Sequence, residues 1–170
     1  RLGNRYISSP KGKALVDKIL GRKNTTTQYG EEINNIAEAC GNMSESKTGA
    51  LIVIRHNMTL EDIVNSGDRI DANVHRRLIQ TLFFKNSPLH DGAVIISGDK
   101  IVAARCTLPI TERTDIPANY GMRHKAAIGV TEETDADAIV VSEQTGEISF
   151  VSGGEVTLIT NAYELKLKLT

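Results

Sequence analysis

The chain has 170 residues, of which 40% are hydrophobic and 24% are charged, so it can bury the core of one globular domain. Its net charge of −1 gives no overall basic field, which excludes a general affinity for a nucleic-acid polymer. No apolar run approaches the ~18 residues of a membrane span. Cys40 and Cys106 follow no CxxC pattern, so the sequence indicates neither a disulfide framework nor a zinc site.

The sequence divides into a peripheral start, a compact body and a short end. Residues 1–28 are expected to be an N-terminal extension, with one short amphipathic helix and a polar linker over 21–27. The domain itself is expected over 29–160, and residues 161–170 are expected to be a C-terminal tail without an assigned role. The chain begins with arginine rather than methionine, so we expect a soluble piece of a longer protein.

The first half of the domain alternates helical and strand patterns. Four apolar residues at helical spacing predict a helix packed on one face: Ile33, Ile36, Ala37 and Cys40. The continuous apolar run 49–54 predicts a strand buried on both faces. A short helix around 60–64, a turn at 67–68 and a second helix over 73–84 follow. Asp71 or Asn73 is expected to cap the second helix.

The second half is richer in strands. A hairpin is predicted from two apolar runs, 93–96 and 101–108, joined across a Gly-Asp turn. A loop over 109–120, a helix over 123–134 and three strands at 138–142, 148–151 and 156–159 complete the domain. This mixture predicts an α/β fold in which helices cover a mixed β-sheet.

Asp91 and Gly92 stand at the entrance of the predicted strand 93–96. An Asp-Gly pair in such a place is usually a turn in which the carboxylate caps its own backbone. The functional interpretation is that Asp91 points into a cleft at the strand end, where carboxylates bind hard metal ions. Gly92 would let the backbone approach a ligand closely, and His90 adds a second potential metal ligand or proton carrier.

Arg123, His124 and Lys125 follow Gly121 and open the predicted helix 123–134. A solvated helix face is the common explanation of such a run. Cations in a first turn, however, oppose the helix dipole, which favours anions at that end. The gathering of cationic side chains at this end of the helix is explained if a phosphate binds between the helix amides and these side chains. Arg123 can grip phosphate oxygens with its planar fork, while Lys125 adds a point charge.

Two further polar groups are typical of ordinary surface. Ser142 and Glu143 end an apolar strand, which is common turn chemistry. The acidic residues between 132 and 137 indicate a solvated helix end rather than a metal site.

These segments together resemble the diadenylate cyclase (DAC) domain, most closely its membrane-anchored CdaA type. The resemblance runs from about Tyr29 to Glu155. The order and spacing of DGA and of RH followed by AAIG are its specific part. The motifs are GALIVI at 49–54, SPLHDGAVI at 87–95, GMRHKAAIG at 121–129, EETDA at 132–136 and VSEQTGEIS at 141–149.

The resemblance implies an α/β fold with a central mixed β-sheet flanked by helices on both sides. It implies ATP as the substrate and a divalent metal ion as the cofactor, magnesium or manganese, with cobalt in some members. Asp91 stands at the aspartate that is associated with the metal and with activation of the ribose 3′-hydroxyl, and His90 stands where some members place a further metal contact. The other positions implied to bind ATP are Gly92, Ala93, Leu108, Met122, Arg123, His124, Lys125, Ser142 and Glu143.

The implied reaction condenses two ATP molecules into cyclic di-AMP and releases two pyrophosphates. One chain holds one ATP, so two chains are expected to meet face to face as a homodimer in the productive state. For the full-length protein, the resemblance implies membrane helices before this fragment, a position at the cytoplasmic face of the cell membrane, and membrane-associated regulators.

Three departures from the family pattern leave alternatives open. Met122 stands at a usual threonine, Lys125 at a usual arginine and Gln144 at a frequent glutamate. Met122 removes a hydroxyl contact to phosphate, and Lys125 lacks bidentate geometry. The alternatives are a nucleotide-binding regulatory module that does not cyclise ATP, and a structural interaction domain whose basic motif docks an acidic partner.

Overall fold

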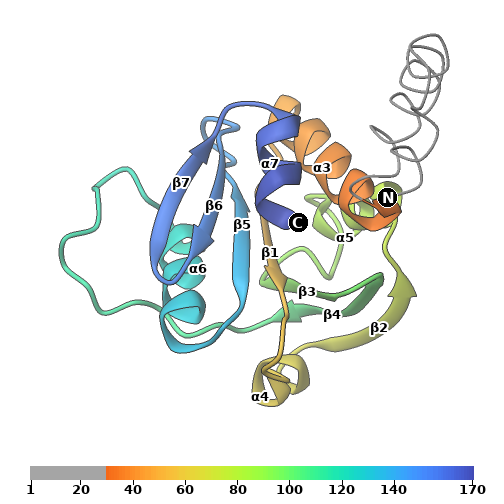
Figure 1. Cartoon of the computed structure of the whole chain (residues 1–170), viewed down its shortest axis with the longest axis horizontal. Coiled ribbons are helices and arrows are strands. Elements are labelled where there is room, and N and C mark those ends of the chain that lie inside the picture. Colours follow the sequence, from red (N-terminus) through yellow and green to blue (C-terminus); the bar gives the residue numbers. More distant parts are fainter. Residues whose placement is uncertain (1–29) are drawn as a thin grey trace, which may run out of the picture.

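One seven-stranded sheet organises the part of the protein that the structure describes (Figure 1), and its central strands are strongly apolar segments of the chain. The computed structural model describes residues 30–170, so the expected extension over 1–28, with its short helix and linker, lies outside the described residues. The elements in chain order are α3 (Gly30–Glu45), β1 (Ala50–Ile54), α4 (Glu61–Asn65), β2 (Asp68–Asn73), α5 (Arg76–Phe83), β3 (Ala93–Ser97), β4 (Lys100–Cys106), α6 (Met122–Glu133), β5 (Asp137–Val141), β6 (Ile148–Ser152), β7 (Glu155–Ile159) and α7 (Ala162–Leu169).

The sheet has the order β2-β4-β3-β1-β5-β6-β7 and is mixed, as predicted. β1 runs parallel to β3, and the other neighbouring strands are antiparallel. β1 lies at the centre of the sheet, so its apolar run is buried on both faces, which confirms that prediction. Ala50 and Ile52 join one apolar cluster, while Leu51 and Val53 join the other.

Helices cover both faces of the sheet, which confirms the predicted fold class (Figure 1). α3, α5 and α7 pack on one face, where Ile36, Phe83 and Leu165 belong to one buried cluster. α4 and α6 cover the other face through Val64 and Ile128. Burial of each such large apolar side chain stabilises the fold by about 1.5–3 kcal/mol. The residues expected as a tail thus contain α7, whose Leu165 is packed in the core.

β2 is a strand that the sequence pattern did not indicate. Its residues are mostly polar and exposed, because among residues 30–170 the strand lies at the edge of the sheet and pairs only with β4. An edge strand needs no continuous apolar face, so the alternation that normally marks a strand is weak here. The turn expected at 67–68 is the entry to this strand.

α5 begins later than its apolar spacing indicates. The helix predicted over 73–84 starts at Arg76, because the two expected caps, Asp71 and Asn73, belong to β2 instead. The N-cap is His75, whose Nδ1 accepts a hydrogen bond from the backbone amide of Arg77 at 3.1 Å.

The topology brings four strand ends to one edge of the sheet. β1 and β3 are parallel and begin at this edge, with Ala50 and Ala93 as their first residues. β4 and β5 run in the opposite direction and end there, because Cys106 lies opposite Ala93 and Val141 lies opposite Ala50. Segments that are far apart in the sequence therefore meet at this edge.

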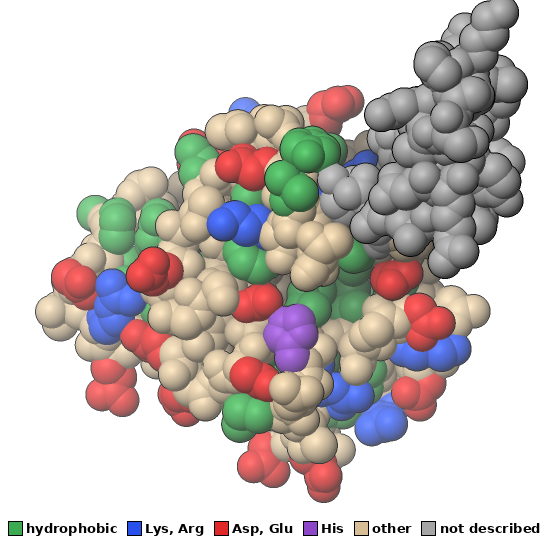
Figure 2. Space-filling model, in the orientation of Figure 1, with side chains coloured by type: hydrophobic (Ala, Val, Ile, Leu, Met, Phe, Trp, Pro, Cys, Tyr) green, Lys and Arg blue, Asp and Glu red, His purple; other side chains and the backbone are tan. Residues whose placement is uncertain are grey.

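The visible surface carries mixed charge. On the face shown in Figure 2, acidic and basic side chains are interspersed, and no extended basic patch gathers there. This distribution agrees with the net charge of −1 and with the absence of an overall basic field. Within residues 30–170, no helix combines the length and the apolar character needed to cross a membrane.

Candidate active site

A cavity of about 610 Å³ opens at the edge of the sheet where the four strand ends meet. This volume is in the range of sites that bind small molecules, roughly 300–1,000 Å³. Strand ends, the start of α6 and the loop between β4 and α6 form its wall. The lining residues are Leu51, Asp91, Gly92, Thr107, Leu108, Ile110, Asn119, Gly121, Met122, Arg123, His124, Ala126, Val140, Val141, Ser142, Glu143 and Gln144.

Most residues predicted for the site line this one cavity. They are Asp91, Gly92, Leu108, Met122, Arg123, His124, Ser142 and Glu143. Three others do not line it. Ala93 is the first residue of β3 and is fully buried in the core, while His90 lies beside Asp91 and Lys125 lies within the first turns of α6. The contacts of these three residues with a nucleotide or a metal ion stay predictions.

Asp91 is open to solvent and has His90 as its neighbour. The Asp91 side chain is 85% exposed, and its Oδ1 lies 3.4 Å from Nε2 of His90. Nδ1 of His90 donates a hydrogen bond to the carbonyl oxygen of Ser87 at 2.7 Å, so the neutral ring presents an unprotonated Nε2 to the carboxylate. Two lone pairs that face each other in this way fit a proton or a metal ion bound between them.

The donor set at this pair fits a divalent ion that takes further ligands from a substrate. Among residues 30–170, no group of three or more His, Cys, Asp or Glu side chains gathers as a metal site. His90 and Asp91 would therefore provide two ligands, and phosphate oxygens and water would provide the rest. An imidazole ligand suits manganese or cobalt better than magnesium, which prefers oxygen.

Gly92 is required by the backbone geometry at the entrance to β3. Its φ of +103° lies in a region that side-chain-bearing residues rarely adopt. A Cβ at this position would lie 2.7 Å from the carbonyl oxygen of Cys106 and 2.9 Å from the carbonyl carbon of Arg105. Because both atoms belong to the backbone of β4, they cannot move aside without disturbing the sheet. Gly92 therefore fixes the close approach that places Asp91 at the cavity.

α6 begins at the cavity without a side-chain cap. Its N-cap is Gly121, which has no side chain to accept hydrogen bonds from the first-turn amides. These amides and the positive end of the helix dipole can therefore interact with an anion in the cavity. Arg123 adds a formal positive charge, and its Nη1 lies 3.5 Å from Oε1 of Glu143. The two ends of the predicted site, Arg123 and Asp91, thus share one cavity.

His124 is held in one orientation by two contacts. Its Nδ1 accepts a hydrogen bond from the Gly121 amide at 3.3 Å, which leaves the proton of the neutral ring on Nε2. The ring of Tyr120 stacks on it, with centroids 4.7 Å apart and planes 14° from parallel. Burial lowers the pKa of His124, an effect that Glu147 opposes and Arg123 reinforces. The arrangement favours a neutral imidazole whose Nε2 can donate a hydrogen bond.

Replacing Tyr120 with alanine should raise the pKa of His124 towards its ordinary value, because water would reach a ring that is now covered. An NMR titration of the His124 ring protons measures the change. Tyr120→Phe keeps the stacked ring and is the matched control, so its titration should follow that of the parent protein. An unchanged His124 pKa in Tyr120→Ala would show that the stack does not shield the ring.

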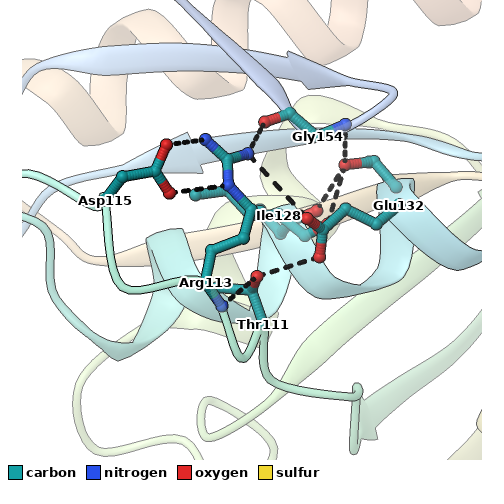
Figure 3. A network of polar contacts seen from close by, with 8 residues as sticks. Thr111, Arg113, Asp115, Ile128, Glu132 and Gly154 are labelled. Carbon is teal, nitrogen blue, oxygen red and sulfur yellow. Dashed lines mark hydrogen bonds and ion pairs between the residues drawn. The ribbon is translucent and has the colours of Figure 1, made fainter.

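The loop between β4 and α6 is tied to its surroundings through Arg113 (Figure 3). The guanidinium donates to both carboxylate oxygens of Asp115, at 3.1 and 3.2 Å, and to the carbonyl oxygen of Gly154 at 3.0 Å. Thr111 donates to Glu132 at 2.9 Å, and Arg113 lies 3.8 Å from the same carboxylate. Because this loop carries part of the cavity lining, these contacts hold one wall in place.

Several lining residues could not be predicted from the sequence. Thr107, Ile110 and Asn119 lie after β4 in a segment without periodic pattern. Leu51 and Val140 belong to strands whose apolar character indicated only core packing. These residues reach the cavity because several strand ends converge there. The convergence depends on the strand order, which the sequence alone does not reveal.

Comparison with known proteins relates the chain to a family. Residues 37–156 match the family DAC, described as "DisA bacterial checkpoint controller nucleotide-binding". The chain is 41% identical over 126 residues to "Diadenylate cyclase CdaS" of Bacillus thuringiensis (strain BMB171), a match that covers 74% of this chain and 63% of the relative. It is 38% identical over 147 residues to "Diadenylate cyclase" of Listeria monocytogenes serotype 1/2a (strain 10403S), covering 82% of this chain and 54% of the relative.

The fold has a close counterpart among solved structures. The crystal structure of a double mutant of DacA from Staphylococcus aureus is 36% identical and superimposes with a TM-score of 0.79, covering 82% of this chain and 93% of that chain. The present chain spans less than two thirds of the length of the two relatives above. From the match over residues 37–156, the chain belongs to the DAC family of nucleotide-binding domains.

Proposed function

We propose that the chain is the catalytic domain of a diadenylate cyclase, which condenses two ATP molecules into cyclic di-AMP and two pyrophosphates. The observation that carries the proposal is that an open carboxylate, Asp91, and the cationic start of α6 meet in one cavity. The names of the relatives, which are diadenylate cyclases, support the same activity.

The cavity offers a suitable surface for each part of ATP. Leu51, Leu108 and Val140 provide apolar contacts of the kind that an adenine ring requires. Arg123 and Nε2 of His124, together with the first amides of α6, provide hydrogen-bond donors for phosphate oxygens. The ribose would lie between these two regions, within reach of Asp91.

In the proposed reaction, the 3′-oxygen of one ATP attacks the α-phosphorus of the other. The bond between this phosphorus and the bridging oxygen of pyrophosphate breaks, and pyrophosphate leaves. Asp91 would orient the 3′-hydroxyl and take its proton, while Arg123 and His124 stabilise negative charge on the phosphate oxygens. A divalent ion bound to His90 and Asp91 would lower the pKa of the hydroxyl and neutralise phosphate charge.

The cavity described above accounts for one ATP per chain, so a symmetric product requires two chains. Several side chains at the cavity are open in a single chain: Asp91 at 85%, Glu143 at 64% and Met122 at 63% exposure. A second copy facing the cavity would cover them and bring the second ATP to the first. Such a face-to-face contact between identical surfaces has two-fold symmetry.

Diluting the protein should lower its specific activity, because dissociation of a small contact separates the two ATP sites. The measurement is the rate of cyclic di-AMP formation per milligram across a wide range of protein concentrations at saturating ATP. A specific activity that stays constant throughout the range would argue against assembly from weakly associating chains.

The direct test of the proposed function is incubation with ATP and a panel of manganese, magnesium and cobalt salts, followed by mass spectrometry. The expected result is cyclic di-AMP together with pyrophosphate. Thermal stabilisation by ATP without any product would instead support the regulatory module, in which Met122 and Lys125 have weakened catalysis. Neither stabilisation nor product would contradict both nucleotide-based functions.

A further inference from the structure

The guanidinium of Arg123 packs against Gly49. A Cβ built on Gly49 would lie 2.5 Å from Nη1, 2.6 Å from Cζ and 2.9 Å from Nη2 of Arg123. The guanidinium therefore occupies the space that any side chain at position 49 would need. Gly49 itself is buried and immediately precedes β1, so the strand end forms the surface on which Arg123 rests.

The backbone alone does not explain glycine at this position. The φ of Gly49 is outside the left-handed region, in contrast to that of Gly92. Alanine could therefore adopt the same backbone conformation, and it would continue the apolar run of β1. The space taken by Arg123 is a constraint on this position that does not depend on the backbone conformation.

Arg123 is confined at a second point by Glu143, whose Oε1 lies 3.5 Å from Nη1. The guanidinium thus contacts Gly49 and lies close to the carboxylate of Glu143. Ordinary contacts between non-bonded carbon and nitrogen atoms are about 3.5 Å or longer, so a methyl group at position 49 would displace the guanidinium by about 1 Å. Since the end of an arginine side chain is flexible, this displacement would not require the sheet to move.

We propose that Gly49 is a positioning residue for catalysis, which acts by leaving the space in which Arg123 lies beside the phosphates. The inference rests on the proposed function, in which Arg123 binds ATP. The inference assigns a specific role to Gly49, the first residue of the GALIVI segment, whose sequence pattern otherwise indicates only a buried strand.

The test is a double-mutant cycle between Gly49→Ala and Arg123→Ala, measured as the affinity for 3′-deoxy-ATP with the divalent ion present. This nucleotide lacks the attacking hydroxyl, so it binds without reacting and affinity can be measured in inactive variants. Gly49→Ala should weaken binding by roughly tenfold in the parent protein, the size expected for a weakened hydrogen bond to a charged group. With Arg123→Ala present, Gly49→Ala should change the affinity by less than about twofold.

Activity with ATP gives a second readout. A misplacement of about 1 Å can cost roughly 100-fold in rate, so Gly49→Ala should lower kcat as well as affinity. The matched control is Gly41→Ala, since Gly41 lies in α3 and no atom of residues 30–170 comes within 4 Å of its Cβ position. This control should bind and react like the parent, and the unfolding midpoint of Gly49→Ala should stay close to that of the parent.

The outcomes separate this inference from the proposed function. If Gly49→Ala weakens binding equally with and without Arg123, it acts on something other than Arg123 and the inference is overturned. If Gly49→Ala is silent while Arg123→Ala weakens binding, the inference fails and the proposed function stands. If Arg123→Ala is itself silent, the role of Arg123 in the proposed function is wrong, and the role of Gly49 falls with it.

Discussion

Asp91→Asn should lower the rate of cyclic di-AMP formation by at least about 100-fold, a loss typical of removing one electrostatic group from an active site. Asparagine keeps the shape of the side chain but loses the negative charge. It can neither accept the proton of the 3′-hydroxyl nor hold a divalent ion as a carboxylate does. The assay is product formation at saturating ATP and metal.

The fold should not be affected by this substitution. The Asp91 side chain is 85% exposed, and its neighbour His90 is itself one-third exposed. The thermal unfolding midpoint should therefore stay within about 1–2 °C of the parent value, since the interactions of so exposed a charge contribute little to stability. Asp99→Asn is the matched control, because it removes the same charge from an exposed turn at the opposite end of β3. Turnover like that of the parent in Asp91→Asn would remove Asp91 from the proposed mechanism.

Gly129→Ala should destabilise the protein by about 2 kcal/mol, although alanine is the better helix former. Gly129 lies in the middle of α6, where the segment after β4 crosses it. A Cβ there would overlap the carbonyl oxygen of Pro109 and lie 2.9 Å from the amide nitrogen of Thr111. These backbone atoms cannot withdraw without moving the loop, so the overpacking outweighs the gain of about 1 kcal/mol in helix propensity.

The control is the same substitution in another helix. The new methyl group of Gly41→Ala in α3 meets no atom of the described part of the chain within 4 Å, and the substitution should stabilise the protein by about 1 kcal/mol. Chemical denaturation of both variants measures the free energies of unfolding, and the predicted changes have opposite signs. A stabilised Gly129→Ala variant would show that the loop yields easily. In that case the affinity for ATP would be expected to fall, because the displaced segment also carries Leu108 and Ile110 of the cavity.

The fold was predictable where one strand or helix carries its own pattern. The continuous apolar run of β1 indicated a central strand, and the helical spacing of Ile36 and Cys40 indicated α3. β2 was missed because an edge strand can be polar along its length. The N-cap of α5 was misassigned for the same reason, since Asp71 and Asn73 look like capping residues until β2 is known to contain them.

The site was predictable to the extent that single segments carry chemistry. Asp91 before β3 and Arg123 at the start of α6 were both indicated by their places next to a strand and a helix. Contacts between distant segments could not be inferred. Glu132 read as part of a solvated helix end, whereas it accepts a hydrogen bond from Thr111 and lies near Arg113. The relation between Gly49 and Arg123 spans 74 positions and leaves no trace in either local pattern.

The meeting of four strand ends at one edge of the sheet has a consequence for folding and binding. The contributing segments lie near residues 50, 92, 107 and 141, so a fragment of the chain that stops before β5 lacks part of the wall. A nucleotide bound there would bridge both halves of the polypeptide and would stabilise only the fully folded chain. Amide hydrogen exchange should consequently slow in β1, β3, β4 and β5 together when ATP is added, rather than in one strand at a time.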